Sequence, residues 1–234
     1  MNTFFIYYYT AIIYSLEILA AITGVFVYKK FKNTAVIYFI HVLIYSFFID
    51  LLGGYTMLIN ANGFLSFLRN TRFEQNYWWY TLMWNLGATS FYVYYFLKIL
   101  KSNSFKKALI GLWAIFILSS IFIISFNFDT FFTSNLSLIN NFSAILILLS
   151  CMFYFVEKLY GNNIFYFYKS INFYISITLL FWWLIMTPLV FFDNYNTRSD
   201  WNYVFLRRQI YMMSNIFMYL TFTFSLLWCK PQNV

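Results

Sequence analysis

The stretch ALIGLWAIFILSSIFIISF at residues 108–126 decides the fold, because it contains no charged residue and follows directly on Lys106 and Lys107. A helix that spans a membrane needs about 20 mainly apolar residues. Backbone groups in hydrocarbon must be paired within helices, so this stretch predicts a transmembrane helix. Together with six similar stretches it predicts an all-α bundle of seven transmembrane helices, at roughly 3–28, 34–59, 77–98, 108–126, 141–160, 170–192 and 208–229.

The composition agrees with this fold class and excludes several others. The chain of 234 residues is 62% hydrophobic and only 9% charged, and its mean hydropathy is +0.68. A soluble chain is typically about 45–50% apolar and about 25% charged. A cytosolic enzyme, a disordered chain, a collagen and a disulfide-stapled secreted scaffold are therefore excluded. No long polar linker separates the predicted spans, so we expect residues 1–234 to form one multi-pass domain in the cell membrane, with the bacterial inner membrane as the expected location.

The basic residues between the spans predict the orientation. Short cytoplasmic loops of membrane proteins carry an excess of Lys and Arg. One set of alternate connections holds ten basic residues and the other holds five, so the N-terminus is expected outside and the C-terminus in the cytoplasm. The ten residues of the predicted inner set are Lys29, Lys30, Lys32, Lys98, Lys101, Lys106, Lys107, Lys158, Lys169 and Lys230. The five of the predicted outer set are Arg69, Arg72, Arg198, Arg207 and Arg208.

The outer arginines allow two interpretations. Glu74, Asp193 and Asp200 lie in the same connections, so salt bridges at the membrane interface would explain the arginines. The planar guanidinium group also suits carboxylate and phosphate groups. The five arginines are therefore also a candidate site for an anion or for the acidic surface of a partner.

Two acidic residues lie near the middle of predicted spans. Glu17 is part of TAIIYSLEILAAITG, and Asp50 is part of HVLIYSFFIDLLGGY. An acid such as Asp at the centre of a spanning helix costs about 2.5–3.5 kcal/mol on insertion scales. Small residues at helical spacing from each acid are typical of close helix contacts, so both acids are expected to face the bundle interior at comparable depth.

Amide and aromatic side chains extend this set of polar residues. Asn85 and Asn215 are predicted in the outer half of the membrane, near the level of Asp50. Such residues would form interhelical hydrogen bonds, a ligand or ion site, or a proton path, and the sequence leaves all three open. The candidate residues for the ligand or ion site are Glu17, Asp50, Asn85, Asn215, Trp84, Tyr211 and Tyr219.

Several kinds of chemistry lack the residues that they need. One histidine, His41, and two cysteines at different depths, Cys151 and Cys229, form no convincing zinc site, so neither a metal nor another cofactor is expected. No nucleophile motif or phosphate-binding glycine loop is present, which predicts a protein that is not an enzyme. Residues 209–229 contain no Lys, which excludes a retinal Schiff base. Nucleic acid is not an expected partner, because the lysines flank the predicted spans.

A series of short motifs runs along nearly the whole chain. Acids in the first two spans and an Asn in the third are followed by aromatic-rich motifs in the later spans. These features are Glu17, Asp50, Asn85, YFVEK at 154–158, FWWLIMTP at 181–188, NIFMY at 215–219, Trp228 and Lys230. The arrangement resembles small uncharacterised bacterial proteins with seven transmembrane helices. The resemblance implies a seven-helix fold and suggests a sensor or a membrane partner in signalling.

These observations favour a membrane sensor or receptor-like module with a small ligand bound in the outer half of the bilayer. The predicted cytoplasmic connections are short, so the output would need a separate cytoplasmic signalling protein or a membrane partner. One alternative is a small transporter or an ion or proton pathway that uses Glu17 and Asp50. Another is a structural membrane subunit of a larger complex. The lipid bilayer surrounds the protein in each case.

Overall fold

The computed structural model describes residues 2–59, 63–160, 169–193 and 201–231. It is 86% helix, and the described residues contain no strand. The main helices are α1 (Asn2–Phe26), α3 (Val36–Gly53), α5 (Thr89–Ile99), α6 (Asn103–Phe126), α8 (Ser137–Leu159), α9 (Ile171–Asp193) and α10 (Trp201–Trp228). Shorter helices are α2 (Tyr28–Phe31), α4 (Tyr77–Trp79), α7 (Phe128–Thr133), the 3-10 helices η1 (Gly54–Leu58) and η2 (Ser66–Leu68), and the π-helix η3 (Tyr80–Ala88).

Six stretches of helix in the described residues are long and apolar enough to cross a membrane, which suggests a multi-pass membrane protein. They are Tyr8–Phe26, Val36–Leu58, Asn103–Phe126, Ser137–Leu159, Ile171–Leu189 and Asn202–Trp228. The other predicted span, 77–98, is helical too, but its winding changes from α4 through the π-helix η3 to α5. None of these three pieces is long enough by itself, so the seventh span stays a prediction.

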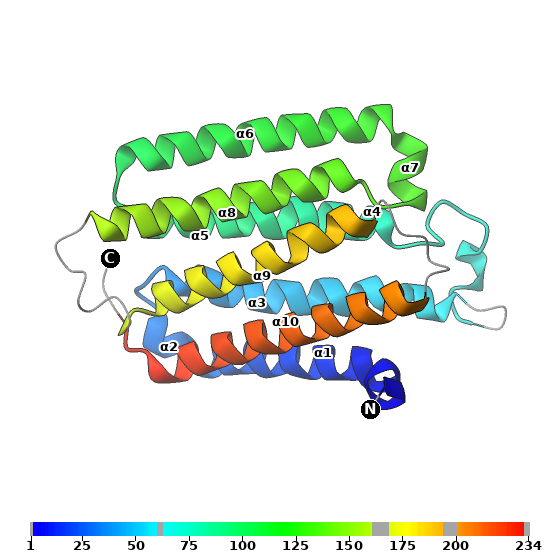
Figure 1. Cartoon of the computed structure of the whole chain (residues 1–234), viewed down its shortest axis with the longest axis horizontal. Coiled ribbons are helices and arrows are strands. Elements are labelled where there is room, and N and C mark those ends of the chain that lie inside the picture. Colours follow the sequence, from blue (N-terminus) through cyan, green and yellow to red (C-terminus); the bar gives the residue numbers. More distant parts are fainter. Residues whose placement is uncertain (1, 60–62, 161–168, 194–200, 232–234) are drawn as a thin grey trace.

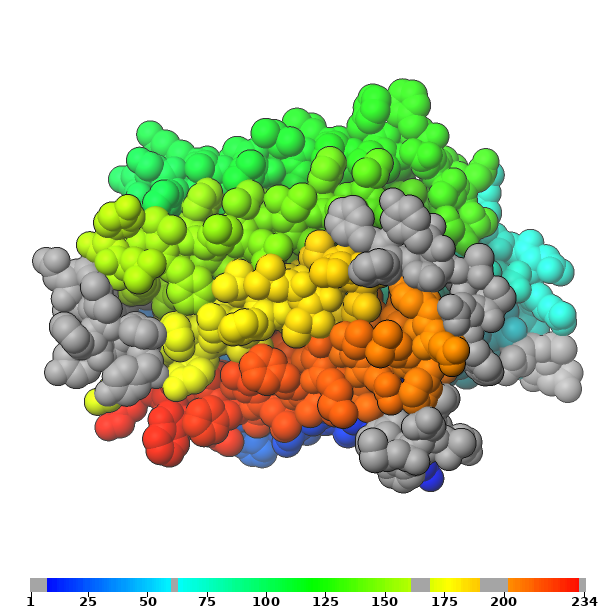
Figure 2. Space-filling view, in the orientation of Figure 1, coloured from blue at the N-terminus to red at the C-terminus, as the bar shows by residue number. Residues whose placement is uncertain are grey.

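The contacts between the described helices close a ring. α6 packs against the outside of this ring and lies at one edge of the bundle (Figure 1). Starting from α1, the ring continues through α3, the run of η3 and α5, α8, α9 and α10, which returns to α1. α6 packs against α5 and α8 and leaves apolar side chains such as Ile115 and Leu118 exposed. Figure 2 shows α8, α9 and α10 side by side on one face of the molecule.

The interior of the ring is filled with aromatic side chains. Phe39, Tyr95 and Phe222 are fully buried and come from α3, α5 and α10. The ring of Phe39 lies 4.8 Å from that of Phe222 and 5.9 Å from that of Tyr95, measured between centroids. Because lipid is as apolar as these side chains, such close packing contributes more to helix association in a membrane than removal from water does.

α1 and α10 close the ring. At their predicted inner ends, a lysine side chain donates hydrogen bonds to backbone carbonyl groups. The last carbonyl groups of a helix have no partner within the helix. Lys30 Nζ, which follows α1, donates to the carbonyl oxygens of Leu226 and Leu227 in the last turn of α10, at 3.2 Å each. The end of α10 is thereby attached to the segment that connects α1 and α3.

Candidate functional site

The candidate site is built around the end of α3, where the helical winding changes. α3 ends at Gly53 and continues as the 3-10 helix η1, so carbonyl groups in its last turns are open to other donors. Three side chains donate to these carbonyl oxygens, one from α1, one from the residue before α4 and one from the last residue of α4. They are Trp79 Nε1 to Ile49 at 2.9 Å, Tyr14 Oη to Asp50 at 3.1 Å, and Asn76 Nδ2 to Gly53 at 2.7 Å.

The absence of a side chain at Gly53 lets the Tyr80 hydroxyl approach α3. A Cβ atom at Gly53 would lie 2.8 Å from Tyr80 Oη and 3.1 Å from Trp79 Cδ1, which is too close for undisturbed side chains. From this place the Tyr80 side chain interacts with the Asp50 carboxyl group. Tyr80 is also the first residue of the π-helix η3, and π winding is rare and frequently found at functional sites.

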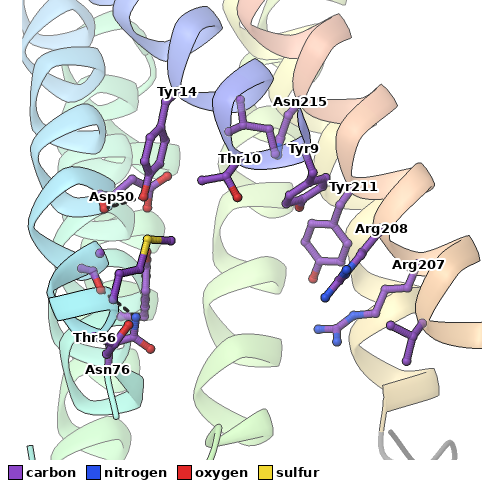
Figure 3. Close-up of a pocket in the computed structure, with 16 residues that line it drawn as sticks. Tyr9, Thr10, Tyr14, Asp50, Thr56, Asn76, Arg207, Arg208, Tyr211 and Asn215 are labelled. Atoms are coloured by element: carbon purple, nitrogen blue, oxygen red, sulfur yellow. Dashed lines mark hydrogen bonds between the residues drawn. The ribbon is translucent and has the colours of Figure 1, made fainter. Parts of the chain in front are cut away.

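An open cavity of about 870 Å³ lies beside the end of α3 (Figure 3). We call it the Asp50 cavity. Its lining comes from α1, from the junction of α3 and η1, from the start of the run that contains η3, and from α10. The lining residues are Tyr9, Thr10, Ile13, Tyr14, Asp50, Gly53, Gly54, Thr56, Met57, Asn76, Tyr80, Val204, Arg207, Arg208, Tyr211 and Asn215.

An acidic side chain and two basic side chains lie on opposite walls of this cavity, as Figure 3 shows. Asp50 lies on one wall, which we call the acidic wall, and Arg207, Arg208 and Tyr211 form the arginine wall. Within the described part of the chain, no salt bridge joins Asp50 to either arginine. Tyr9 interacts electrostatically with Asp50 and with both arginines, so it lies within reach of both walls.

Glu17 is buried close to the acidic wall but does not line the cavity. Its side chain is 3% exposed, and Tyr219 Oη donates to Glu17 Oε1 at 3.0 Å. Among the described residues Glu17 Oε2 has no hydrogen-bond partner, although the Asp50 carboxyl is near enough to interact electrostatically. The two predicted mid-membrane acids are therefore neighbours, with one at the cavity and the other in the bundle interior.

Asn215 lines the cavity, and a hydrogen bond from a side chain of α9 orients its amide group. Trp182 Nε1 donates to Asn215 Oδ1 at 2.8 Å, and the ring of Trp182 contacts that of Trp84 at a centroid distance of 6.5 Å. Trp84 therefore does not line the cavity, and its connection to the site is the ring contact with Trp182.

Asn85 belongs to a different polar contact. It is buried, and its Nδ2 donates to Asn140 Oδ1 of α8. One turn further along, the hydroxyl groups of Thr89 and Ser143 also form a hydrogen bond. These contacts join the run of η3 and α5 to α8, so Asn85 has the geometry of an interhelical hydrogen bond rather than of a cavity residue.

The predicted outer arginines are divided between separate places. Arg207 and Arg208 line the Asp50 cavity. Arg72 forms a salt bridge of 3.2 Å with Asp129 and lies over the ring of Phe128. Arg69 is exposed and does not line the cavity. Arg198 lies outside the described residues.

The sequence singled out only one of the four tyrosines that line the cavity among the described residues. Tyr9, Tyr14 and Tyr80 all line it, together with the predicted Tyr211. Tyr14 lies three residues before Glu17, so its position on the same helix face was visible. For Tyr9 and Tyr80 the signal is weak, because 26% of all residues are aromatic and no local spacing distinguishes them.

The site's residues do not form a metal centre by the usual criterion. In residues 2–59, 63–160, 169–193 and 201–231, no group of three or more His, Cys, Asp or Glu side chains could hold one metal ion. Comparison with protein-family models, curated proteins and solved structures finds no match. The functional interpretation therefore depends on the charges, hydroxyl groups and openness of the Asp50 cavity.

Proposed function

We propose that the chain is a non-enzymatic membrane sensor of receptor-like design that binds a small ligand in the Asp50 cavity. One observation carries this proposal: four separate segments of the chain line the cavity. A ligand that fills the cavity would contact α1, the end of α3, the start of the η3 run and α10 at the same time. Its binding would therefore favour one arrangement of these segments over another.

The proposed topology has seven spans, with the N-terminus outside and the C-terminus in the cytoplasm. In support of a seventh span, Tyr77–Ile99 is helical without interruption and occupies a place in the ring between α3 and α8. A helix of about 20 residues is long enough to cross the hydrocarbon core of a bilayer. One set of alternate connections holds ten basic residues and the other holds five, and this excess supports the orientation.

In this proposal α10 carries the signal across the membrane. Arg207 and Arg208 in its first half and Asn215 near its middle line the cavity, and Tyr219 in its second half donates a hydrogen bond to Glu17. Its last turn is held by Lys30 at the predicted inner end. A movement of α10 caused by a ligand would thus reach the side on which a separate cytoplasmic protein would detect it.

A small transporter or an ion or proton pathway is the second candidate function. The observation that favours it is Glu17 Oε2, which is buried near Asp50 and has no hydrogen-bond partner within the described residues. Ionisable groups at membrane depth commonly mark ion or proton pathways. In this case Asp50 at the cavity would deliver a cation or a proton to Glu17.

Photo-crosslinking at the predicted inner end tests the sensor. We expect a photoreactive residue in place of Lys230, in native membranes, to capture one specific cytoplasmic protein. Asp50→Asn and Arg208→Gln should change the yield by about fivefold or more, the lower end of typical allosteric coupling. Arg69→Gln is the matched control, because Arg69 is an exposed arginine outside the cavity.

The same variants separate the two functions. Capture that is unchanged by both cavity substitutions would contradict the sensor. Cation or proton flux into proteoliposomes that Asp50→Asn abolishes, without any captured partner, would establish the transport pathway in its place.

A further inference from the structure

The two charged walls of the Asp50 cavity face each other without a salt bridge between them. Asp50 lies on one wall and Arg207 and Arg208 on the other (Figure 3). The space between Asp50 and Arg208 leaves room for a ligand that carries both a cationic and an anionic group.

The acidic wall suits a cationic group. Asp50 is in the last turn of α3, where the helix dipole is negative, and the Glu17 carboxyl lies near it. The tyrosine rings of Tyr9, Tyr14 and Tyr80 also line this cavity. Aromatic faces attract ammonium groups, including substituted ones, so carboxylate and rings together favour an ammonium ligand.

The arginine wall suits a carboxylate or a phosphate. Arg207 and Arg208 are consecutive residues about two turns into α10, so both guanidinium groups come from the same part of this helix. The Arg207 guanidinium lies over the Tyr211 ring at 5.4 Å, which fixes its direction. Arg208 is exposed, so its planar group of donors is accessible to an anion.

A ligand with one charge would interact favourably with only one of Asp50 and Arg208, which lie on opposite walls. A single small ion also leaves most of a cavity of about 870 Å³ unfilled, whereas this volume is typical of sites for small organic molecules. We infer that the Asp50 cavity binds a small zwitterion, with an ammonium group toward Asp50 and a carboxylate or phosphate group toward Arg207 and Arg208. This inference rests on the proposed function, because it names the ligand class of the same site.

Two sources share this chemistry. One is a free solute outside the cell, and the other is the headgroup of a zwitterionic lipid such as phosphatidylethanolamine. The cavity lies at the predicted outer end of the bundle, where both are within reach. The test therefore compares the soluble headgroup with the intact lipid.

Calorimetric titration of the full chain in detergent tests the inference, with phosphoethanolamine and γ-aminobutyrate as the zwitterionic probes. Ethanolamine supplies the cationic half alone and inorganic phosphate the anionic half alone. We expect at least one zwitterion to bind about tenfold or more tightly than either half, because it makes charge-assisted contacts with both walls. Equal binding of a zwitterion and one of the halves, or no binding by any probe, would overturn the inference.

Substitutions assign each half of the probe to its wall. Asp50→Asn should remove the advantage of the zwitterion over phosphate, and Arg208→Gln should remove its advantage over ethanolamine. Asp129→Asn and Arg69→Gln are the matched controls, because both residues are exposed and neither lines the cavity. If Asp50→Asn does not fold, Arg208→Gln on an exposed side chain gives the same test from the other wall. A zwitterion advantage that survives Arg208→Gln would overturn the assignment.

Nanodiscs distinguish the two sources of ligand. Phosphoethanolamine should bind equally in phosphatidylethanolamine and phosphatidylglycerol nanodiscs if the ligand is a free solute. It should bind only in phosphatidylglycerol nanodiscs if the lipid headgroup already fills the cavity. A crosslink at Lys230 that responds to the cavity variants, with no zwitterion binding, would keep the sensor and overturn only this inference.

Discussion

At the scale of single residues, Glu17 shows what local spacing predicts and what it does not. Ala20 and Ala21 share its helix face and are 0% and 7% exposed, in agreement with the predicted orientation toward the interior. The hydrogen-bond partner, Tyr219, lies 202 residues further along the chain. Spacing within one helix contains no information about which helix it faces, so this pair was not predictable from the sequence. The same holds for Asn85 and its partner on α8.

Replacing Tyr219 by Phe tests the contribution of this pair. The substitution removes the hydroxyl that donates to Glu17 Oε1 and leaves a buried acid without that bond. We expect a loss of about 0.6–1.7 kcal/mol in the free energy of unfolding, the range measured for hydrogen bonds between membrane helices. Reversible unfolding in a mixed-detergent titration measures it. Tyr160→Phe, at a side chain that is 87% exposed, is the control, and equal losses in the two variants would contradict the role of the bond.

At the scale of helical elements, the end of α3 depends on how closely the η3 run approaches it. The sequence predicted a helix over 77–98, and the structure has one over Tyr77–Ile99. It did not predict the π winding of Tyr80–Ala88, because hydrophobicity and length are nearly the same for both kinds of helix. The contacts of Asn76, Trp79 and Tyr80 with the end of α3 were missed because no local spacing in the sequence distinguishes these residues.

Two glycines give a matched test of this approach. Gly53→Ala would place a Cβ atom 2.8 Å from Tyr80 Oη, so Tyr80 and Trp79 must move. We expect destabilisation of about 1–3 kcal/mol, as for other overpacked positions, together with weaker binding in the Asp50 cavity. Gly111→Ala has no atom within 4 Å of its new Cβ and should be neutral or stabilising by up to about 1 kcal/mol. Thermal unfolding of both variants checks this, and equal midpoints would refute the close contact.

Two neighbouring lysines, Lys29 and Lys30, allow a matched test of the contact at the end of α10. Lys30→Gln removes the cation that donates to Leu226 and Leu227, and cations at a helix C-terminus contribute about 0.3–1 kcal/mol. We expect faster amide hydrogen exchange in the last turn of α10. The neighbouring Lys29 is exposed and, within the described residues, donates no hydrogen bond, so Lys29→Gln should leave this exchange unchanged. Exchange that is unaffected in both variants would show that Lys30 does not hold the helix end.

At the scale of the whole molecule, composition and span length predicted a helical membrane protein, and the structure contains six candidate spans. The position of α6 outside the ring was not predictable. Helices in lipid are apolar on every side, so hydrophobic periodicity does not distinguish a face toward lipid from a face toward another helix. The order of helices in the ring depends on side-chain packing that only the folded chain displays.

The number of spans has a direct experimental consequence. Seven spans place the two ends of the chain on opposite sides of the membrane, whereas six place them on the same side. We expect a fluorescent protein fused after residue 234 to be active in the cytoplasm and an N-terminal epitope to be accessible from outside. Cys151 and Cys229 are both buried, so single-cysteine labelling of the loops gives an independent check. Two ends on the same side would contradict the seven-span topology.

The closure of the ring between α1 and α10 has a consequence for biosynthesis. A ribosome releases α1 into the bilayer long before it makes α10, so Glu17 enters the membrane when Tyr219 does not yet exist. An unfinished chain therefore presents an unsatisfied acid to lipid or to the insertion machinery, and the completed chain hides it. Glu17 thus gains the hydrogen bond from Tyr219 only after the last helix has been made.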